Sequence, residues 1–149
     1  MDRRHRRSPG AHPRPERSAR LAQRRGGTVA EAVEAYYDGA HDAPAAVDVR
    51  QSSGPFVEAA WAALRTVPPG APVTYGQLAA LAGDPAAARG AAQCCVRNVA
   101  ALFVPCHRVH RADGSLGGFR YGLDLKQRLR DREDAVLSEA LVSVVSQLQ

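Results

Sequence analysis

Apolar residues recur at helical spacing along much of the chain, separated by short stretches rich in glycine and proline. The first such segment follows Thr28, which we expect to cap a helix that ends at Gly39. Residues 45–49 favour a strand only weakly. A second helix is predicted over 56–67, where the apolar positions share one face and Pro-Pro-Gly follows at 68–70. We expect this helix to form part of the hydrophobic core.

Two further short helices are predicted over 75–82 and 86–96, joined by a turn at 83–85. Thr74 is a suitable cap for the first of them. A pair of short helices joined by a glycine-containing turn is typical of a helix-turn-helix unit. The second helix is rich in alanine, so its backbone can lie very close to a neighbouring molecule or helix. The neighbour is either a groove of DNA or another helix of the protein, and the sequence pattern does not decide between the two.

The C-terminal third alternates between turns and helices. Asp113-Gly114 is a strong hairpin turn, and 117–122 is predicted to be a flexible loop. A charged helix is predicted over 124–132, ending near Glu133. An apolar stripe over 136–148 then predicts a separate amphipathic helix. We expect this helix to pack on the body, with a partner surface as the alternative.

The net charge of +5 is unevenly distributed. Residues 1–27 hold nine arginines against Asp2 and Glu16, a net +7, so the remainder of the chain carries −2. Because 1–27 is interrupted by proline and glycine and poor in apolar residues, it is predicted to be a disordered basic arm. Such an arm could bind phosphates by releasing counterions. An arginine-rich leader without a specific function, or a wrongly assigned start, explains the composition equally well.

Hydrophobic residues make up 45% of the 149 residues, enough for one core of alanine, valine and leucine. The sequence shows neither an apolar run of membrane-spanning length nor a signal peptide, so we expect a soluble, cytoplasmic protein. Its three cysteines, two of them adjacent, make a poor disulfide framework and fit a reducing compartment. No metal site is predicted, because no cysteine or histidine pair has metal-ligand spacing.

The strongest candidate for chemistry is Cys106, which lies between Pro105 and His107. A thiol becomes nucleophilic as the thiolate, and a neighbouring base or cation raises the thiolate fraction. Pro105 favours a sharp turn there rather than a continued strand. These three residues alone are also consistent with an inert cysteine buried beside a histidine. Cys94 and Cys95 are expected to be small, buried helix residues.

Motifs elsewhere in the chain bear on this choice. In order and spacing they are Phe56, Trp61, Tyr75-Gly76-Gln77-Leu78-Ala79, Ala88-Arg89, Asn98, Pro105-Cys106-His107-Arg108-Val109, Gly122-Leu123, Lys126, Leu129 and Glu133. With this set, the stretch 54–133 resembles the catalytic domain of the O6-alkylguanine-DNA alkyltransferases, also called methylated-DNA–protein-cysteine methyltransferases. Residues 31–49 faintly resemble the end of that family's N-terminal domain, most of which is missing.

The resemblance implies a mainly α-helical fold, a winged-helix-like helix-turn-helix domain with a small β-hairpin, preceded by the disordered basic arm. We therefore divide the chain into four parts. They are the arm at 1–27, a remnant of the N-terminal domain with a linker at 28–53, a catalytic DNA-binding domain at 54–134, and an amphipathic helix at 135–149.

The resemblance also implies a mechanism that needs no cofactor. Cys106 is then the nucleophile and final alkyl acceptor, and His107 acts through a water as its base. Glu133 orients His107, and Asn98 holds the turn that leads into the active-site loop. Because the thioether product is stable, each molecule reacts once.

The implied partner is double-stranded DNA containing O6-alkylguanine, bound through the minor groove by a monomer. Tyr75 is expected to push on a phosphate and to hydrogen-bond the flipped base, while Arg89 fills the gap that the base leaves. Backbone groups of Cys106, Val109 and Arg120 read the guanine edge. The remaining candidates for DNA or substrate binding are Ala88, Arg108, Phe119 and Tyr121.

Some positions depart from the family pattern. Phe119 stands where tyrosine is usual, and Val99 replaces a usual proline. Arg120 and Tyr121 stand where a small residue and a glycine are usual, so their bulk is expected to reshape the substrate pocket. The leading hypothesis is a single-turnover DNA repair alkyltransferase. A non-catalytic binder of alkylated DNA and a DNA-independent thiol enzyme remain as alternatives.

Overall fold

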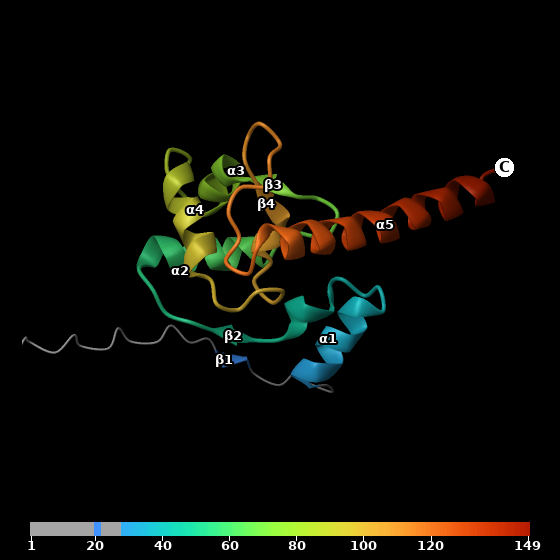
Figure 1. The fold of residues 1–149 in the computed structure, drawn as a ribbon, viewed down its shortest axis with the longest axis horizontal. Helices are drawn as coiled ribbons and strands as arrows, with labels where there is room; N and C mark the ends of the chain where they lie inside the picture. Colours follow the sequence, from blue (N-terminus) through green and yellow to red (C-terminus); the bar gives the residue numbers. More distant parts are fainter. Residues whose placement is uncertain (1–19, 22–27) are drawn as a thin grey trace, which may run out of the picture.

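The computed structural model describes residues 20–21 and 28–149, and in this part the chain is mainly helical (Figure 1). None of the helices in these residues is long and apolar enough to cross a membrane. The α-helices are α1 (Val29–Tyr37), α2 (Pro55–Leu64), α3 (Tyr75–Leu81), α4 (Ala88–Arg97) and α5 (Leu123–Gln147). The 3-10 helices are η1 (Ala43–Ala46) and η2 (Cys106–Arg108), and the strands are β1 (Arg20–Leu21), β2 (Val49–Arg50), β3 (Val73–Thr74) and β4 (Val109–His110).

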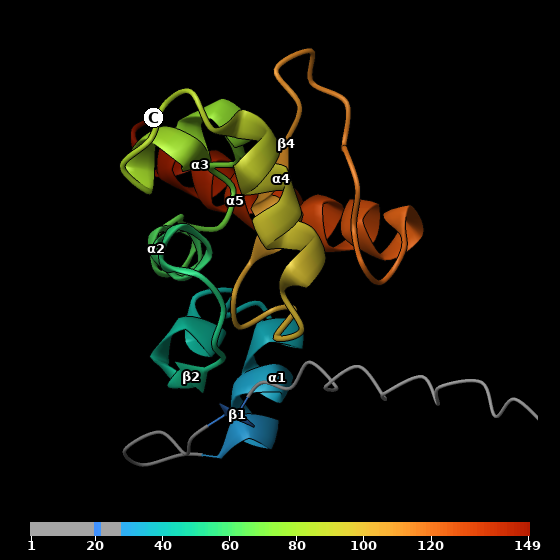
Figure 2. The ribbon, with the colours of Figure 1, turned by 90° about the vertical axis from the view of Figure 1, so that its left-hand side faces the viewer.

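The elements are stacked, with α3 and α4 at one end, α2 in the middle, and α1 with β1 and β2 at the other end (Figure 2). Helices α2, α3 and α4 pack against one another and enclose the main core. The Trp61 indole, from α2, donates to the Cys94 carbonyl in α4 at 2.9 Å. The buried side chains of this core are Val57, Ala60, Trp61, Leu64, Val67, Tyr75, Leu78, Ala79, Ala91, Cys94, Cys95, Ala100, Val104, Cys106 and Val109.

The caps expected from the sequence are present. The Thr28 hydroxyl accepts a hydrogen bond from the Glu31 backbone N–H at 3.1 Å, so it starts α1 as predicted. Thr74 and Gln77 form a reciprocal capping box at the start of α3. The next helix begins at Ala88, slightly later than predicted. Two short helices joined by a turn are therefore confirmed.

The predicted β-hairpin is wrong. Strand β4 pairs with β3, in parallel, instead of with a strand that follows it in sequence. The turn at Asp113-Gly114 is present, but no strand follows it in the described chain. The reason lies in the backbone after the turn: Gly117 adopts a left-handed φ of +70°, so the returning chain leaves the extended conformation that a second strand needs.

The predicted end of a helix near Glu133 is also wrong, because α5 continues unbroken through this point. The stretch contains no glycine or proline that would end it. Lys126, Leu129 and Glu133 are buried on the body, whereas the side chains from Val136 onward are exposed, reaching 81% at Leu148. Val136 and Leu137 still lie close to Gly39 and Gly70. Figure 1 shows the rest of this half extending away from the other elements, so the predicted packing of 136–148 on the body is found only at its start.

The N-terminal predictions have mixed outcomes. The predicted disordered arm lies outside the described residues except at β1, which pairs antiparallel with β2. The weak strand prediction at 45–49 is mostly wrong, since η1 occupies its start and β2 begins only at Val49. Proline at position 44 favours the 3-10 turn, because its ring lacks the N–H that a strand ladder uses.

Candidate active site

The thiol of Cys106 lies at the start of η2, 1% exposed and surrounded by core residues. Asn98, the C-cap residue of α4, donates through Nδ2 to the Cys106 Sγ at 3.3 Å and to the Val104 carbonyl at 2.8 Å. Its Oδ1 accepts from the Ala100 backbone N–H at 3.0 Å. One fully buried side chain therefore fixes both the loop before η2 and the sulfur.

His107 and Glu133 form the second part of the site. His107 Nε2 lies 2.7 Å from Glu133 Oε1, so the carboxylate holds the proton on Nε2 and leaves Nδ1 as an acceptor. Nδ1 is buried and has no hydrogen-bond partner among the described residues. Burial lowers the pKa of His107 even though Glu133 acts in the opposite direction. The imidazole is therefore neutral at physiological pH, as a base must be.

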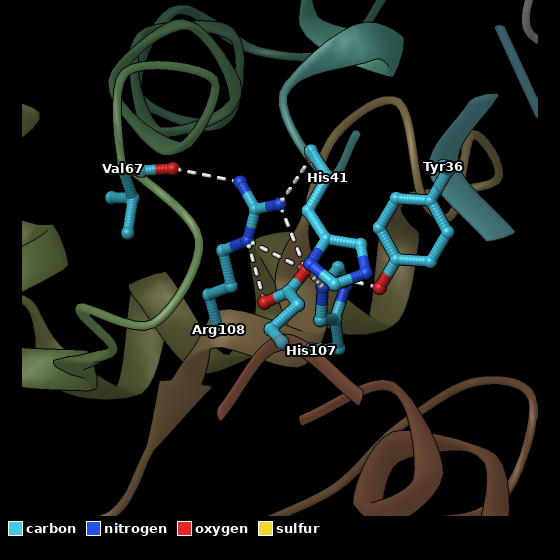
Figure 3. Close-up of polar contacts among 6 residues, drawn as sticks. Tyr36, His41, Val67, His107 and Arg108 are labelled. Carbon is cyan, nitrogen blue, oxygen red and sulfur yellow. Dashed lines mark hydrogen bonds and ion pairs between the residues drawn. The ribbon is translucent and has the colours of Figure 1, made fainter. Parts of the chain in front are cut away.

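The buried Arg108 side chain also binds the Glu133 carboxylate (Figure 3). Its Nε lies 3.1 Å from both oxygens of Glu133, and its Nη2 lies 2.8 Å from Oε1. The guanidinium also donates to the carbonyls of Val67 and His41. Burial alone would raise the pKa of Glu133, but the hydrogen bonds from His107 and Arg108 hold it at about 2. The prediction that Arg108 binds DNA is wrong, because its side chain is buried and fully engaged.

Lys126 is a buried residue of the candidate site to which the sequence interpretation gave no role. It is fully buried on α5, its Nζ donates to the carbonyls of Leu116 and Gly118, and it lies 5.7 Å from the Tyr75 ring centroid. Burial lowers the pKa of Lys126 to about 8. Burial raises the pKa of Cys106, and the Asn98 hydrogen bond and the Lys126 charge oppose that rise. A lysine on the buried face of a helix is the signal that could have identified it.

Tyr75 connects α3 to the segment 115–122, which we call the substrate loop. Its hydroxyl donates to the Gly118 carbonyl at 3.4 Å, and burial raises the pKa of Tyr75 to about 12, so the phenol is neutral. Gly117 has φ +70°, and a Cβ there would meet the Tyr75 hydroxyl oxygen at 2.5 Å. Glycine therefore allows the loop to lie directly against the phenol.

We predict that Gly117→Ala displaces the Tyr75 ring and destabilises the fold by about 1–3 kcal/mol, because the added methyl group clashes and the left-handed backbone is strained. Chemical denaturation measures the loss. Gly118→Ala is the matched control, since a Cβ at Gly118 would meet nothing within 4 Å. Equal stability of the two variants would contradict the contact.

A groove of about 410 Å³ lies beside the substrate loop and is lined by Tyr75, Ala88 and Arg89 together with Val96 and Gly118. Three of the predicted DNA-binding residues therefore share one surface. Residues lining it further are Thr74, Gly76, Ala92, Gln93, Arg111 and Ala112.

The bulky residues of the substrate loop, Phe119, Arg120 and Tyr121, do not line this groove. The Arg120 guanidinium lies 3.4 Å from the Val96 carbonyl, and the Tyr121 hydroxyl donates to the Val99 carbonyl at 3.0 Å. Phe119 packs against the main core. The Arg120 and Tyr121 side chains both reach the end of α4 and the loop after it, and the expectation that they reshape the substrate pocket stays a prediction.

Comparison with known proteins identifies the domain that carries this arrangement. The family model described as 6-O-methylguanine DNA methyltransferase, DNA binding domain, matches residues 55–135. The chain belongs to this family. The methyltransferase domain thus contains two pairs that the fold brings into contact, Asn98 with the Cys106 thiol and His107 with Glu133.

Relatives in this methyltransferase family cover different shares of the chain. The bifunctional transcriptional activator/DNA repair enzyme Ada of Escherichia coli is 45% identical over 58% of this chain, but the match spans 24% of Ada. A methylated-DNA–protein-cysteine methyltransferase of Salmonella typhimurium is 32% identical over 85% of this chain and 74% of its own length. The chain spans less than half of the length of the first relatives it matches.

A solved methyltransferase structure shows the same fold. The crystal structure of Mycobacterium tuberculosis OGT in complex with DNA matches with a TM-score of 0.62 and 31% identity, covering 72% of this chain and 65% of that chain. This match agrees with the mainly helical fold and the small sheet described above.

Proposed function

We propose that this chain repairs DNA by a single transfer of an alkyl group from guanine O6 to the sulfur of Cys106. The arrangement that carries the proposal is the Cys106 thiol, held by Asn98 and followed directly in sequence by His107, whose imidazole Glu133 orients. It matches the nucleophile, base and orienting acid of thiol-dependent catalysis. The names of the relatives, methylated-DNA–protein-cysteine methyltransferase, agree with this chemistry.

In the proposed reaction the thiol proton passes through a water to Nδ1 of His107, the free acceptor nitrogen. The thiolate sulfur attacks the alkyl carbon, a C–S bond forms, and the bond between that carbon and guanine O6 breaks. The electron pair stays on guanine, which recovers a proton and pairs normally. Since the thioether is stable, the protein is consumed, and no cofactor is required.

Access to the sulfur requires two movements. The O6 group lies inside the duplex, so the base must be flipped out at a cost of a few kcal/mol. Cys106 is 1% exposed, so residues around it must also move before a base can reach it, and we propose that the substrate loop is the part that moves. The loop is held by Lys126 and Tyr75, whose hydrogen bonds to loop carbonyls would be exchanged during entry.

We propose that α3 and α4 act as a winged-helix-like helix-turn-helix unit that binds duplex DNA in the minor groove as a monomer in the cytoplasm. Arg89 and Ala88 lie in the first turn of α4, beside Tyr75 in the same groove. Small side chains along α4 allow close approach of the backbone to DNA, and Arg89 supplies the cation that enters the stack.

We predict that Arg89→Ala weakens binding to duplex DNA containing O6-methylguanine by about 1–3 kcal/mol and makes the salt dependence shallower by about one counterion. Fluorescence anisotropy over a salt series measures both quantities. Arg128→Ala, which removes an exposed arginine on α5, is the control. An unchanged affinity in Arg89→Ala would count against α4 as the DNA-binding helix.

Incubation of the intact protein with duplex DNA containing O6-methylguanine tests the function. Each molecule should gain the mass of one methyl group in place of one hydrogen, and an equal amount of O6-methylguanine should become guanine. Specific binding without any gain in mass would support a damage binder and overturn the transfer.

A further inference from the structure

The segment 28–53 lies outside the matched family domain, yet its side chains reach both parts of the active site. We propose that Tyr36 and Gln51 are positioning residues for the alkyl transfer, acting through Glu133 and Asn98. This inference rests on the proposed function. If it holds, the segment 28–53 supplies side chains that position the active-site residues, and it is not merely a remnant of the N-terminal domain.

Tyr36 acts on the acid that orients the base. Its side chain is fully buried on α1, and its hydroxyl donates to Glu133 Oε1 at 3.0 Å. The same oxygen faces His107 Nε2 at 2.7 Å. Burial and the neighbouring carboxylate both raise the pKa of Tyr36, so the phenol remains a donor. Its hydrogen bond withdraws charge from Oε1 and makes this oxygen a weaker acceptor for the imidazole proton.

Gln51 acts on the residue that holds the thiol. Its Nε2 donates to Asn98 Oδ1 at 3.0 Å, and its Oε1 accepts from the Val99 backbone N–H at 3.4 Å. These contacts oppose rotation of the Asn98 amide. A rotated amide would turn its oxygen toward Cys106, replacing a donor with an acceptor and disfavouring the thiolate.

The segment is attached firmly enough to act on the site. Arg65, the C-cap residue of α2, donates to the carbonyls of Phe103 and Ala45, joining the segment to the loop before Cys106. The Arg108 guanidinium donates to the His41 carbonyl at 3.1 Å. Ala32, Val47 and Phe103 form a second buried apolar cluster between α1 and that loop.

Single-turnover transfer by the full chain, measured across pH, tests Tyr36. The groups that face the His107–Glu133 pair are Arg108 from η2, Lys126 from α5, and Tyr36 and His41 from the segment. Tyr36→Phe removes only the hydroxyl, so Glu133 becomes a stronger acceptor and the pKa of His107 rises.

The acid limb of the rate profile should therefore move up by about half a pH unit to one unit, with transfer about three- to tenfold slower on that limb. Above the limb the rate should stay within about twofold of wild type. Nuclear magnetic resonance titration of the His107 ring should show the same upward shift. Tyr37→Phe, the same change at an exposed neighbour on α1, is the control.

Gln51→Ala should slow transfer about fivefold at every pH. The change loosens the Asn98 amide that donates to the Cys106 sulfur, and it leaves the contacts of the base His107 unchanged. Its control is Gln127→Ala, which alters an exposed glutamine on α5.

If wild type transfers the methyl group while both variants match it in rate and pH profile, the inference fails and the proposed function stands. A fall in the active fraction with an unchanged pH profile and His107 titration would show a merely structural role for Tyr36 and overturn its part. If wild type forms no adduct, the proposed function fails and takes the inference with it.

Discussion

Glu133→Gln is expected to lower the free energy of unfolding by about 3–5 kcal/mol, because it leaves the Arg108 guanidinium buried without an opposing charge. The same change should slow single-turnover methyl transfer by about 100-fold or more, because the neutral amide no longer orients His107 or stabilises its protonated form. Urea denaturation and a quenched-flow transfer assay measure the two effects. Glu139→Gln, at an exposed position of α5, is the control. Stability close to that of the control would contradict the role assigned to the buried carboxylate.

The same residue predicts a pH dependence of stability. The pKa of Glu133 is about 2 in the folded protein, against an ordinary value of 4.5. The unfolded chain therefore binds this proton more readily, and the stabilisation by the carboxylate is complete above pH 4.5 and lost as the pH falls toward 2. Between these values wild type should lose stability more steeply than Glu133→Gln. Parallel curves for the two proteins would contradict this assignment.

Cys106→Ser is expected to abolish methyl transfer while leaving the affinity for DNA containing O6-methylguanine within about twofold of wild type. The serine hydroxyl keeps the size of the side chain, but it ionises far less readily than a thiol. Transfer to protein is measured with a labelled methyl group, and binding by anisotropy. Cys94→Ala is the control, because its sulfur belongs to the core between α2 and α4. If Cys106→Ser acquired as much labelled methyl group as wild type, Cys106 would not be the alkyl acceptor.

Local patterns predicted the helices well, because each depends on residues close in sequence. Thr28 and Thr74 cap their helices as expected. Helix α2 buries Ala60 and Leu64 as its spacing indicated, but its buried face is centred closer to Val57 and Trp61 than predicted. Where the local signal was incomplete, the prediction failed. Asp113-Gly114 forms its turn, but Gly117 adopts a φ of +70°, so the chain that follows is not extended as a second strand would be.

The site itself depended on the family resemblance, which named Cys106, His107, Glu133 and Asn98 but not their other partners. Arg108 was assigned to the binding of DNA or substrate. Its partners, Glu133, Val67 and His41, are distant from it in sequence, and no sequence pattern brings them together.

Tyr36 and Gln51 escaped notice for the same reason. Each reaches its partner across a large distance in sequence, from a segment that resembles the family only faintly. The direction of the Tyr121 side chain was equally unpredictable, because it is set by a hydrogen bond to the Val99 carbonyl. The sequence identified the candidate catalytic residues, whereas tertiary packing determined which side chains contact them.

The most direct measurement of the central claim locates the transferred group. After reaction with duplex DNA carrying labelled O6-methylguanine, tryptic cleavage after Arg89, Arg97 and Arg108 separates peptide 90–97, which holds Cys94 and Cys95, from peptide 98–108, which holds Cys106. Label on Cys106 in peptide 98–108, approaching one methyl group per molecule, is the predicted result. Label on 90–97, or DNA binding without any labelled peptide, would contradict the account.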